Sequence, residues 1–368
     1  MKKIFFIFLI MLIAVFSPVF AGEILHSERG IVTQVEYVDT SDIMNDENIH
    51  THQNVEVKLL SGKFKGEKIF IENQLTSNPA YDIILKRGDK VILHAEAKGE
   101  LIDDVDDINY FIADIERTGS LYILAFIFAG LLFVIGRKKG LLSFCAIFFT
   151  VAMIFWVMRP MILFGISPIF SALSACFVST ILTVYLVGGF NKKSTSAVIG
   201  TVLSLCFAAL LSLLTIKIAN LTGFAGEETV FLYSTRPDLD FTGILSASMM
   251  LAALGAVMDV GVSIASTINE VFVTDNSLSV NDLFAAGMNV GRDIIGTMSN
   301  TLILVYLGSS LPLLLLSSNV DFVKFFNLNT VVTEISSAFI GSIAVLLCVP
   351  VTALVSSYLI KTNFKKNI

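Results

Sequence analysis

The feature that most constrains this chain is a series of apolar segments after its first third, most of them about as long as a membrane is thick. A helix needs about 20 apolar residues to cross about 30 Å of hydrocarbon. The segments are 119–136, 141–159, 168–189, 195–217, 243–264, 293–316 and 335–360. With 55% hydrophobic and 15% charged residues, the composition also favours a membrane protein. We therefore predict a mostly α-helical membrane protein, with a bundle of about seven transmembrane helices over residues 119–360.

The N-terminus has the pattern of an export signal. Lys2-Lys3 forms a basic start, the stretch 4–16 is apolar, and Val19-Phe20-Ala21 resembles a small-residue cleavage site. The apolar stretch is shorter than a span requires, so we predict a cleaved signal peptide at 1–21. An uncleaved signal anchor is the alternative. In both cases residues 22–118 are expected outside the cytoplasm.

Residues 22–118 are predicted to form a small β-rich domain. Apolar and polar residues alternate in five short runs, which are 30–37, 55–60, 68–72, 90–95 and 110–116. Turn residues separate these runs, and five short strands over about 90 residues indicate a closed or nearly closed β-barrel. An OB-like barrel is one topology that fits this pattern.

The charge of the exported domain bears on its partners, and the positions of the cysteines bear on disulfide bonds. The segment 22–118 has 20 Asp and Glu residues against 10 Lys and Arg residues, so the exported domain is acidic. No basic nucleic-acid surface is present, and nucleic acid is not expected as a partner. All four cysteines lie in apolar segments, so no disulfide framework is predicted.

Two polar clusters in the exported domain raise the question of a metal site. One is the stretch 42–52, which ends in His50 and His52, and the other is the acidic stretch 103–107. Oxygen ligands suit hard cations and imidazoles suit zinc, but neither spacing matches a known ligand motif. Metal binding is therefore left open, and no cofactor is predicted.

Basic residues predict the orientation in the membrane. Arg137-Lys138-Lys139, Lys192-Lys193 and the tail 361–368 fall at the expected inner ends of the spans, as the positive-inside rule requires. We therefore predict an extracytoplasmic domain at 22–118 and a basic cytoplasmic tail at 361–368. The acidic loop 265–292, also expected inside, is the exception.

Two spans contain an internal helix breaker. Pro312 cannot donate to the carbonyl of Gly308, and Pro350 leaves the carbonyl of Leu346 without its donor. Kinks are expected at both prolines. At Pro312 a broken helix that serves a binding site and an ordinary packing kink are equally acceptable interpretations, whereas at Pro350 a packing kink is favoured.

Polar side chains follow one face of each of two neighbouring spans. On a helix, Asp259, Ser263, Ser266 and Glu270 fall within an arc of about 60°, as do Asn289, Asp293, Gly296 and Asn300, with Arg292 and Thr297 beside the second arc. Ionisable groups at membrane depth usually face protein or water. We therefore predict that the fifth and sixth spans pack through these faces and form a polar site. The candidate residues for binding a substrate or ion are Asp259, Ser263, Asn289, Arg292, Asp293, Thr297 and Asn300.

The expected roles follow from the chemistry of these side chains. Asp259 would take a cation or proton, Arg292 would balance its charge, and the amide and hydroxyl groups would donate or accept hydrogen bonds. The alternative is a structural network in which interfacial charges fix helix packing. No catalytic constellation accompanies them, because the membrane body contains no His and lacks nucleophile-elbow, His-Glu-x-x-His and phosphate-loop motifs. We do not expect an enzyme.

Several stretches resemble the YibE/F family of bacterial multi-pass membrane proteins. These are GGFNKK at 188–193, NLTGF at 220–224, GAVMDVGVSIASTINEV at 255–271, and GMNVGRDIIGTMSNTLILVYLGSSLPLLL at 287–315. The resemblance covers most of 119–360, and the signal and β-domain resemble the longer members. It implies an integral protein of the bacterial cytoplasmic membrane and carries over no substrate and no catalytic residue.

The leading hypothesis is a permease or transport component with its polar site between the fifth and sixth spans. Its expected partners are the lipid bilayer and a small solute or ion, with a homo-oligomer or another membrane protein left open. The alternative is a scaffold or sensor in which the exported β-domain binds a partner and the helical body only anchors it. An ion-binding cavity continuous with water would favour the first hypothesis. An exposed apolar groove on the β-domain and a dry, fully paired network around Asp259 would favour the second.

Overall fold

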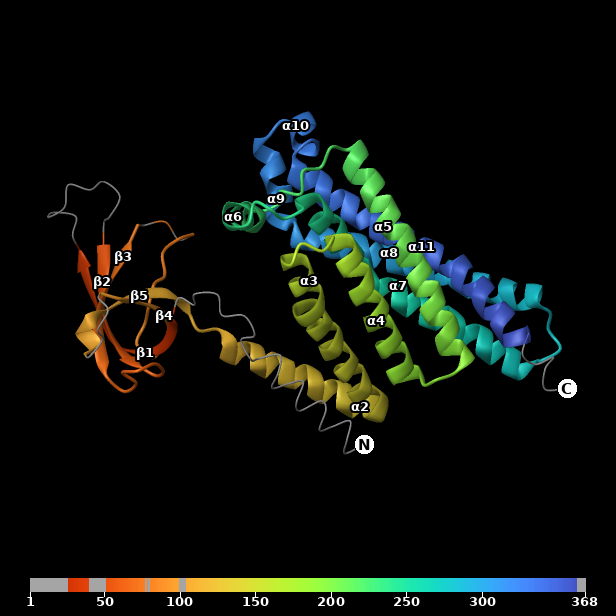
Figure 1. Ribbon diagram of the computed structural model, residues 1–368, viewed down its shortest axis with the longest axis horizontal. Helices are drawn as coiled ribbons and strands as arrows, with labels where there is room; N and C mark the ends of the chain where they lie inside the picture. Colours follow the sequence, from red (N-terminus) through yellow and green to blue (C-terminus); the bar gives the residue numbers. More distant parts are fainter. Residues whose placement is uncertain (1–25, 40–50, 77, 79, 99–103, 363–368) are drawn as a thin grey trace. The chain divides into compact units, whose positions relative to one another are not determined.

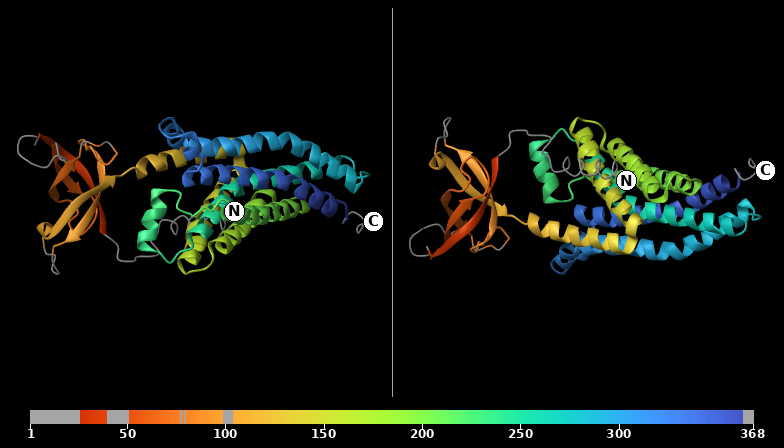
Figure 2. Two further views of the ribbon diagram at one scale, coloured as in Figure 1. Left: turned by 90° about the horizontal axis from the view of Figure 1, so that it is seen from above. Right: turned by 90° about the horizontal axis from the view of Figure 1, so that it is seen from below.

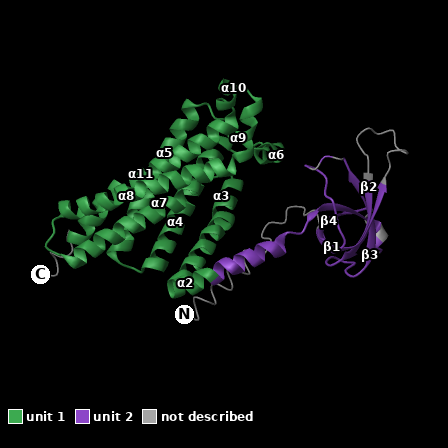
Figure 3. Cartoon of the chain, turned by 180° about the vertical axis from the view of Figure 1, so that it is seen from behind, with its two compact units in different colours: residues 1–15, 131–368 green, residues 16–130 purple. Residues whose placement is uncertain are grey.

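The computed structural model describes residues 26–39, 51–76, 78, 80–98 and 104–362. They form two compact units, one within Phe16–Gly130 and one within Leu131–Ile368, and each is described by itself (Figure 3). Three predictions lie wholly or mostly outside the described residues. They are the signal peptide at 1–21, the polar cluster at 42–52 and the basic tail at 361–368.

The first unit contains a nearly closed barrel of antiparallel strands (Figure 1). Its described strands are β1 (His26–Asp39), β2 (Thr51–Leu59), β3 (Lys68–Leu75), β4 (Lys90–Ala97) and β5 (Ile108–Ile115). Their order is β3-β2-β1-β4-β5, and contacts between β3 and β5 bring the two edges together. The five predicted strands are confirmed, with ends that differ by a few residues.

Alternation of side chains builds the core of the barrel. On β2, Val55, Val57 and Leu59 are fully buried, while the residues between them are exposed or half-buried. Register shifts occur in β1 between Val32 and Gln34 and in the β4–β5 pairing. Bulges of this kind bend a strand and let a small sheet curl towards closure.

One polar side chain is fully enclosed by the barrel. The Gln53 amide donates from Nε2 to the carbonyl of Leu85 at 3.1 Å. Its Oε1 accepts from the N–H of Leu85 at 3.0 Å and from Nδ2 of Asn73 at 3.0 Å. Since buried polar groups need partners, these bonds fasten the segment between β3 and β4 to the barrel.

A second polar contact joins the first and last strands. The Tyr110 hydroxyl on β5 donates to Oε2 of Glu28 on β1 at 3.5 Å, and Glu28 is buried. Burial of the phenol and the neighbouring Glu28 carboxylate raise the pKa of Tyr110 to about 12. The neutral phenol is therefore the form that the folded barrel favours.

The rest of the described chain is helical. Its elements are α2 (Thr118–Met153), the π-helical η2 (Ile154–Met158), α3 (Arg159–Leu163), α4 (Pro168–Gly188), α5 (Lys192–Ile218), α6 (Glu227–Thr235), α7 (Phe241–Thr274), α8 (Val280–Ser309), α9 (Leu311–Leu316), η3 (Ser317–Asn319), α10 (Phe322–Phe326) and α11 (Asn329–Thr362). The prediction of a mostly α-helical body is confirmed.

Within the described residues, five helices are long and apolar enough to cross a membrane, or six if the bent pair α8–α9 is one span. The sequence predicts about seven. The difference lies in 118–163, where two predicted spans form one helical run of 46 residues. This run is interrupted at Arg137, whose φ of 49° and ψ of −127° are not helical. A Cβ at Gly140 would overlap the carbonyl of Leu132, so the chain turns sharply at this point.

In the second unit, α7 is the most buried of the spans and contacts α4, α5, α8 and α11 (Figures 1 and 2). Helix α5 meets its neighbours through a stripe of small buried residues, which are Ser196, Gly200, Ser204, Ala208 and Ser212. Small residues let membrane helices approach closely, and van der Waals packing then holds them together. The hydroxyl groups of Ser212 and Ser246 share a hydrogen bond between α5 and α7.

The two internal prolines behave differently. Helix α8 ends at Ser309, and the axis turns by 67° into Leu311–Asn319. The predicted break at Pro312 is therefore confirmed, since the proline enters a new helix at its first turn. Pro350, in contrast, lies inside the continuous helix α11.

Candidate functional site

A groove with a mostly apolar lining and several polar side chains opens on one face of α7. It has a volume of about 750 Å³ and is lined by α4, α5, α7 and the later part of α2. Its polar lining residues are Lys139, Ser143, Thr150, Thr183, Lys193, Ser194, Asp259, Ser263 and Ser266. Two of the predicted site residues, Asp259 and Ser263, therefore lie together in one cavity.

Asp259 occupies the middle of the most buried helix. It follows the start of α7 (Phe241–Thr274) by 18 residues, or about 27 Å at the helical rise. Its side chain is exposed to the groove, and no described residue gives its carboxylate an ion pair or hydrogen bond. An unpaired carboxylate at this depth needs water, a proton or a bound cation.

The other groove residues differ in how far their hydrogen-bonding groups are used. The Lys193 ammonium donates to the hydroxyl of Ser266 at 3.3 Å and so places one positive charge on the groove wall. The hydroxyls of Ser143 and Thr150 donate to carbonyls of their own helix at 3.0 and 3.1 Å. Thr183 also lines the groove, and its hydroxyl is buried without a hydrogen-bond partner among the described residues.

The predicted packing of the fifth and sixth spans through their polar faces is wrong. Asn289, Arg292, Asp293, Thr297 and Asn300 are all exposed on α8, and none of them lines the groove. No ion pair joins Asp259 to Arg292 within the described part of the chain, and the Arg292 guanidinium donates instead to Oδ1 of Asn289 on its own helix at 3.0 Å.

Glycine packing explains this orientation of α8. A Cβ at Gly291 would overlap Cγ1 of Val349 on α11, and one at Gly287 would lie 2.6 Å from Cδ1 of Ile268 on α7. The buried stripe that contains both glycines lies about 160° around the helix from the polar residues. In lipid, close packing of small residues drives helix association more than polar contacts do, so α8 buries its glycines rather than its charges.

Comparison with known proteins places the chain in a family. Residues 124–362, well over half of the chain, match the family described as YibE/F-like protein. The chain belongs to the YibE/F-like family. Residues 23–107 match the YibE/F family N-terminal domain, and no curated protein or solved structure matches the chain. The predicted resemblance is thus confirmed for both units, and this YibE/F-like chain is a multi-pass membrane protein.

A second cavity in this YibE/F-like protein was not predicted from its sequence. It has a volume of about 420 Å³, lies where α8 breaks into α9, and is lined mainly by apolar side chains. Glu334 on α11 and Tyr306 and Ser310 beside the break are its polar members, and the Tyr306 hydroxyl is buried without a partner among the described residues. No other polar residue near Glu334 in the sequence indicated a site, so the predicted helix break at Pro312 was the one sequence signal for this cavity.

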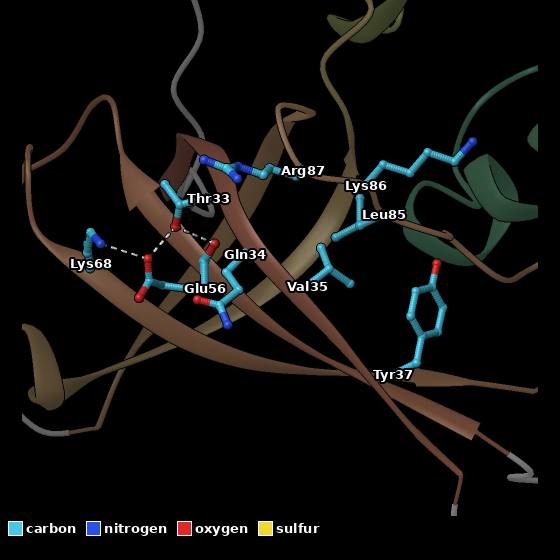
Figure 4. Close-up of a pocket in the computed structure, with 9 residues that line it drawn as sticks. All are labelled: Thr33, Gln34, Val35, Tyr37, Glu56, Lys68, Leu85, Lys86 and Arg87. Carbon is cyan, nitrogen blue, oxygen red and sulfur yellow. Dashed lines mark hydrogen bonds and ion pairs between the residues drawn. The ribbon is translucent and has the colours of Figure 1, made fainter.

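The β-barrel carries a cavity of its own, with a volume of about 660 Å³ (Figure 4). On its floor the Glu56 carboxylate accepts from the Lys68 ammonium at 2.8 Å and from the Thr33 hydroxyl. The hydrogen bonds from Lys68 and then Thr33 lower the pKa of Glu56. Lys86 and Arg87 also line the cavity, so its charged groups are mainly positive even though the domain is acidic.

Metal-binding side chains do not gather in the part of the chain that the structure describes. No group of three or more His, Cys, Asp and Glu side chains there could hold a metal ion. In the cluster 103–107, Asp104 caps the short helix η1 (Val105–Asp107) by accepting from the N–H of Val105, and Asp107 accepts from the N–H of Asp104. These carboxylates stabilise a turn. His50 and its neighbours at 42–49 lie outside the described residues.

Proposed function

We propose that this protein is a membrane transport component in which the groove on α7 binds a proton or a small cation at Asp259. The observation that carries the proposal is the unpaired Asp259 carboxylate at mid-helix, facing a large groove whose lining is mostly apolar. By insertion scales a charged Asp at the centre of a membrane helix costs about 2.5–3.5 kcal/mol. A bound cation or proton offsets this energy, whereas a purely structural carboxylate would have a protein partner.

Each polar residue of the groove has a proposed role in binding the cation or proton. Asp259 holds the cation or proton, and the hydroxyl groups of Ser263 and Thr183 supply neutral ligands or hydrogen bonds. The charged side chains of the groove are Asp259, Lys139 and Lys193, and the two ammonium groups disfavour a divalent cation and favour a proton or a single monovalent cation at Asp259. The sequence predicted that Arg292 balances the charge of Asp259. In this proposal Lys193 has that role, because Arg292 does not line the groove.

Two finer points of architecture belong to the same proposal. The run 118–163 crosses the membrane twice, with Arg137 at the turn, because 46 helical residues would extend about 69 Å. With the bent pair α8–α9 as one span, the total becomes seven. The basic residues at 137–139 and 192–193 then lie on the cytoplasmic side and the β-barrel lies outside. No catalytic step is part of this proposal.

Carbodiimide labelling tests the cation site. These reagents modify protonated carboxyl groups in apolar surroundings, and a bound cation protects the group. In the purified full-length protein, labelling of Asp259, read by peptide mass spectrometry, should fall as pH rises or when sodium or potassium is added. Labelling that responds to neither pH nor cations would contradict the proposal.

Asp259→Asn separates a binding role from a structural one. Since Asp259 has no partner to strand among the described residues, Asp259→Asn should accumulate normally in membranes and melt at or above the wild-type temperature in detergent. It should nevertheless lose the cation-dependent labelling and any phenotype that the gene supports. Glu270→Gln, on the same arc of α7 but near its end, is the matched control and should change neither. A loss of stability in Asp259→Asn would indicate a structural carboxylate.

The β-barrel cavity supports the second candidate, a sensor or scaffold. Its strands follow the cyclic order 1-2-3-5-4, which fits the OB-like topology predicted from the sequence, and OB folds bind oligomeric ligands across the face of strands 2 and 3. Lys86 and Arg87 would attract an anionic ligand. Replacing both by Glu should abolish the phenotype if the barrel is the working part, and should leave Asp259 labelling intact in either case.

A further inference from the structure

The helix α8 carries a polar face that has no partner on another described element of this chain. We define it as Asn289, Arg292, Asp293, Thr297 and Asn300. All five side chains are exposed, and the hydrogen bond from Arg292 to Asn289 stays within the helix. The opposite face of α8 is occupied by α7 and α11.

This face reaches the depth of the hydrocarbon. A Cβ at Gly341 of α11 would lie 3.6 Å from Cδ1 of Leu302 and 3.8 Å from Cβ of Ala253 on α7. Ala253 is the thirteenth residue of the 34-residue helix α7, so the end of the polar face lies level with the interior of the bundle. Charged and amide side chains at this depth are strongly disfavoured against lipid, and a protein or water must cover them.

No other membrane-length helix among the described residues is suited to cover the face. The first half of α2, residues 121–136, carries no charged side chain and only one hydroxyl, that of Tyr122. It cannot pair with Arg292 or Asp293. The remaining long helices are already packed against one another or line the groove. The described part of this chain therefore offers the face no partner, and a second molecule can supply one.

We propose that the polar face of α8 is the interface with a second copy of this chain. The face is complementary to itself, because it carries one positive and one negative side chain at adjacent positions. All copies insert in the same orientation, so a two-fold axis along the membrane normal places both α8 helices at the same depth. Arg292 of each copy then pairs with Asp293 of the other, and the Thr297 and Asn300 side chains meet across the axis.

Cysteine crosslinking of the full-length protein in native membranes tests this interface. Thr297→Cys is introduced after the four native cysteines are replaced, and copper phenanthroline is the oxidant. The matched control keeps only native Cys206, which is exposed on α5. A covalent dimer should form at least tenfold faster in the Thr297→Cys variant than in the Cys206 control. Equal rates would reflect random collision and would overturn the proposal, as would a crosslinked product with the mass of a different protein.

A charge exchange tests the pairing itself. Arg292→Asp places like charges across the axis, and so does Asp293→Arg, so each should reduce dimer formation severalfold. The double variant Arg292→Asp with Asp293→Arg restores opposite charges and should recover the dimer. Membrane abundance and melting temperature in detergent show whether each variant is folded. Failure of the double variant to recover the dimer, while it remains folded, would contradict the assigned pairing. Monomeric wild-type protein in mild detergent and in membranes would overturn the interface.

Discussion

Replacement of Gly291 by Ala is the sharpest test of how α8 packs. A Cβ at this position would overlap Cγ1 of Val349 and lie 3.3 Å from Cδ1 of Ile264. Valine in a helix has one strongly preferred χ1 rotamer, so Val349 cannot easily turn away. The matched control is Gly255→Ala on α7, where a Cβ would have no neighbour within 4 Å.

The pair of variants isolates the steric effect. Both changes gain the same helix propensity, about 0.5–1 kcal/mol, because alanine loses less backbone entropy than glycine. Overpacking of a well-filled interface typically costs about 1–3 kcal/mol. We therefore expect Gly291→Ala to be less stable than Gly255→Ala by about 1–3 kcal/mol, since the propensity gain cancels between them.

Thermal unfolding of the purified protein in detergent measures this difference. For a helical body of this size, a change of about 1 kcal/mol shifts the melting temperature by roughly 2–4 °C. Gly255→Ala should melt at or slightly above the wild-type temperature, and Gly291→Ala should melt clearly below it. If Gly291→Ala were as stable as the control, α8 would not bury its glycine stripe, and the assignment of its polar face to the outside would fail.

Three further predictions concern the barrel and the α7–α8–α11 contact. Gln53→Ala leaves a buried N–H and carbonyl without partners and should destabilise the barrel by roughly 2–4 kcal/mol in urea unfolding, whereas the exposed Gln34→Ala should be neutral. Cysteines at Gly287 and Ala353 should form a disulfide, because a Cβ at Gly287 would lie 3.2 Å from Cβ of Ala353; no disulfide would show a different register. The pKa of Tyr110 is raised from 10.0 to about 12, so its contribution to stability is complete below pH 10 and lost as pH rises to 12. The variant Tyr110→Phe cannot ionise, so its stability should fall less than that of the wild type between pH 10 and pH 12. If both proteins lost stability equally over this range, the raised pKa of Tyr110 would be contradicted.

Local patterns were sufficient to predict most elements of this protein. Alternation of apolar and polar residues predicted the five described strands, because successive side chains of a strand point to opposite faces and only one face of this small sheet is buried. The apolar segments predicted a membrane body, since hydrocarbon tolerates only helices or closed barrels. Pro312 predicted the break between α8 and α9, because a missing N–H acts within one helical turn.

The turn at Arg137 and the neighbours of each helix face were decided by contacts between segments distant along the helices, which local sequence patterns do not describe. A short gap in apolarity around Arg137 predicted two separate helices, and the helical run 118–163 is interrupted there by one non-helical residue at which the chain turns sharply. The polar residues of α7 and α8 were correctly placed on narrow arcs. Their mutual packing was wrongly predicted because periodicity gives a face without its neighbour.

The sequence by itself determined which residues of α8 share a face, and the tertiary structure decided what that face meets. Helical periodicity is a property of the backbone, so Asn289, Arg292 and Asn300 fall together whatever surrounds them. Their neighbour depends instead on which competing surface packs more closely. Gly287 and Gly291 let α8 approach α7 and α11, and the resulting dispersion contacts outweigh polar pairs that are weak between membrane helices. Which contact is more favourable depends on the surfaces of α7, α8 and α11 together, so it cannot be predicted from the sequence of any one helix.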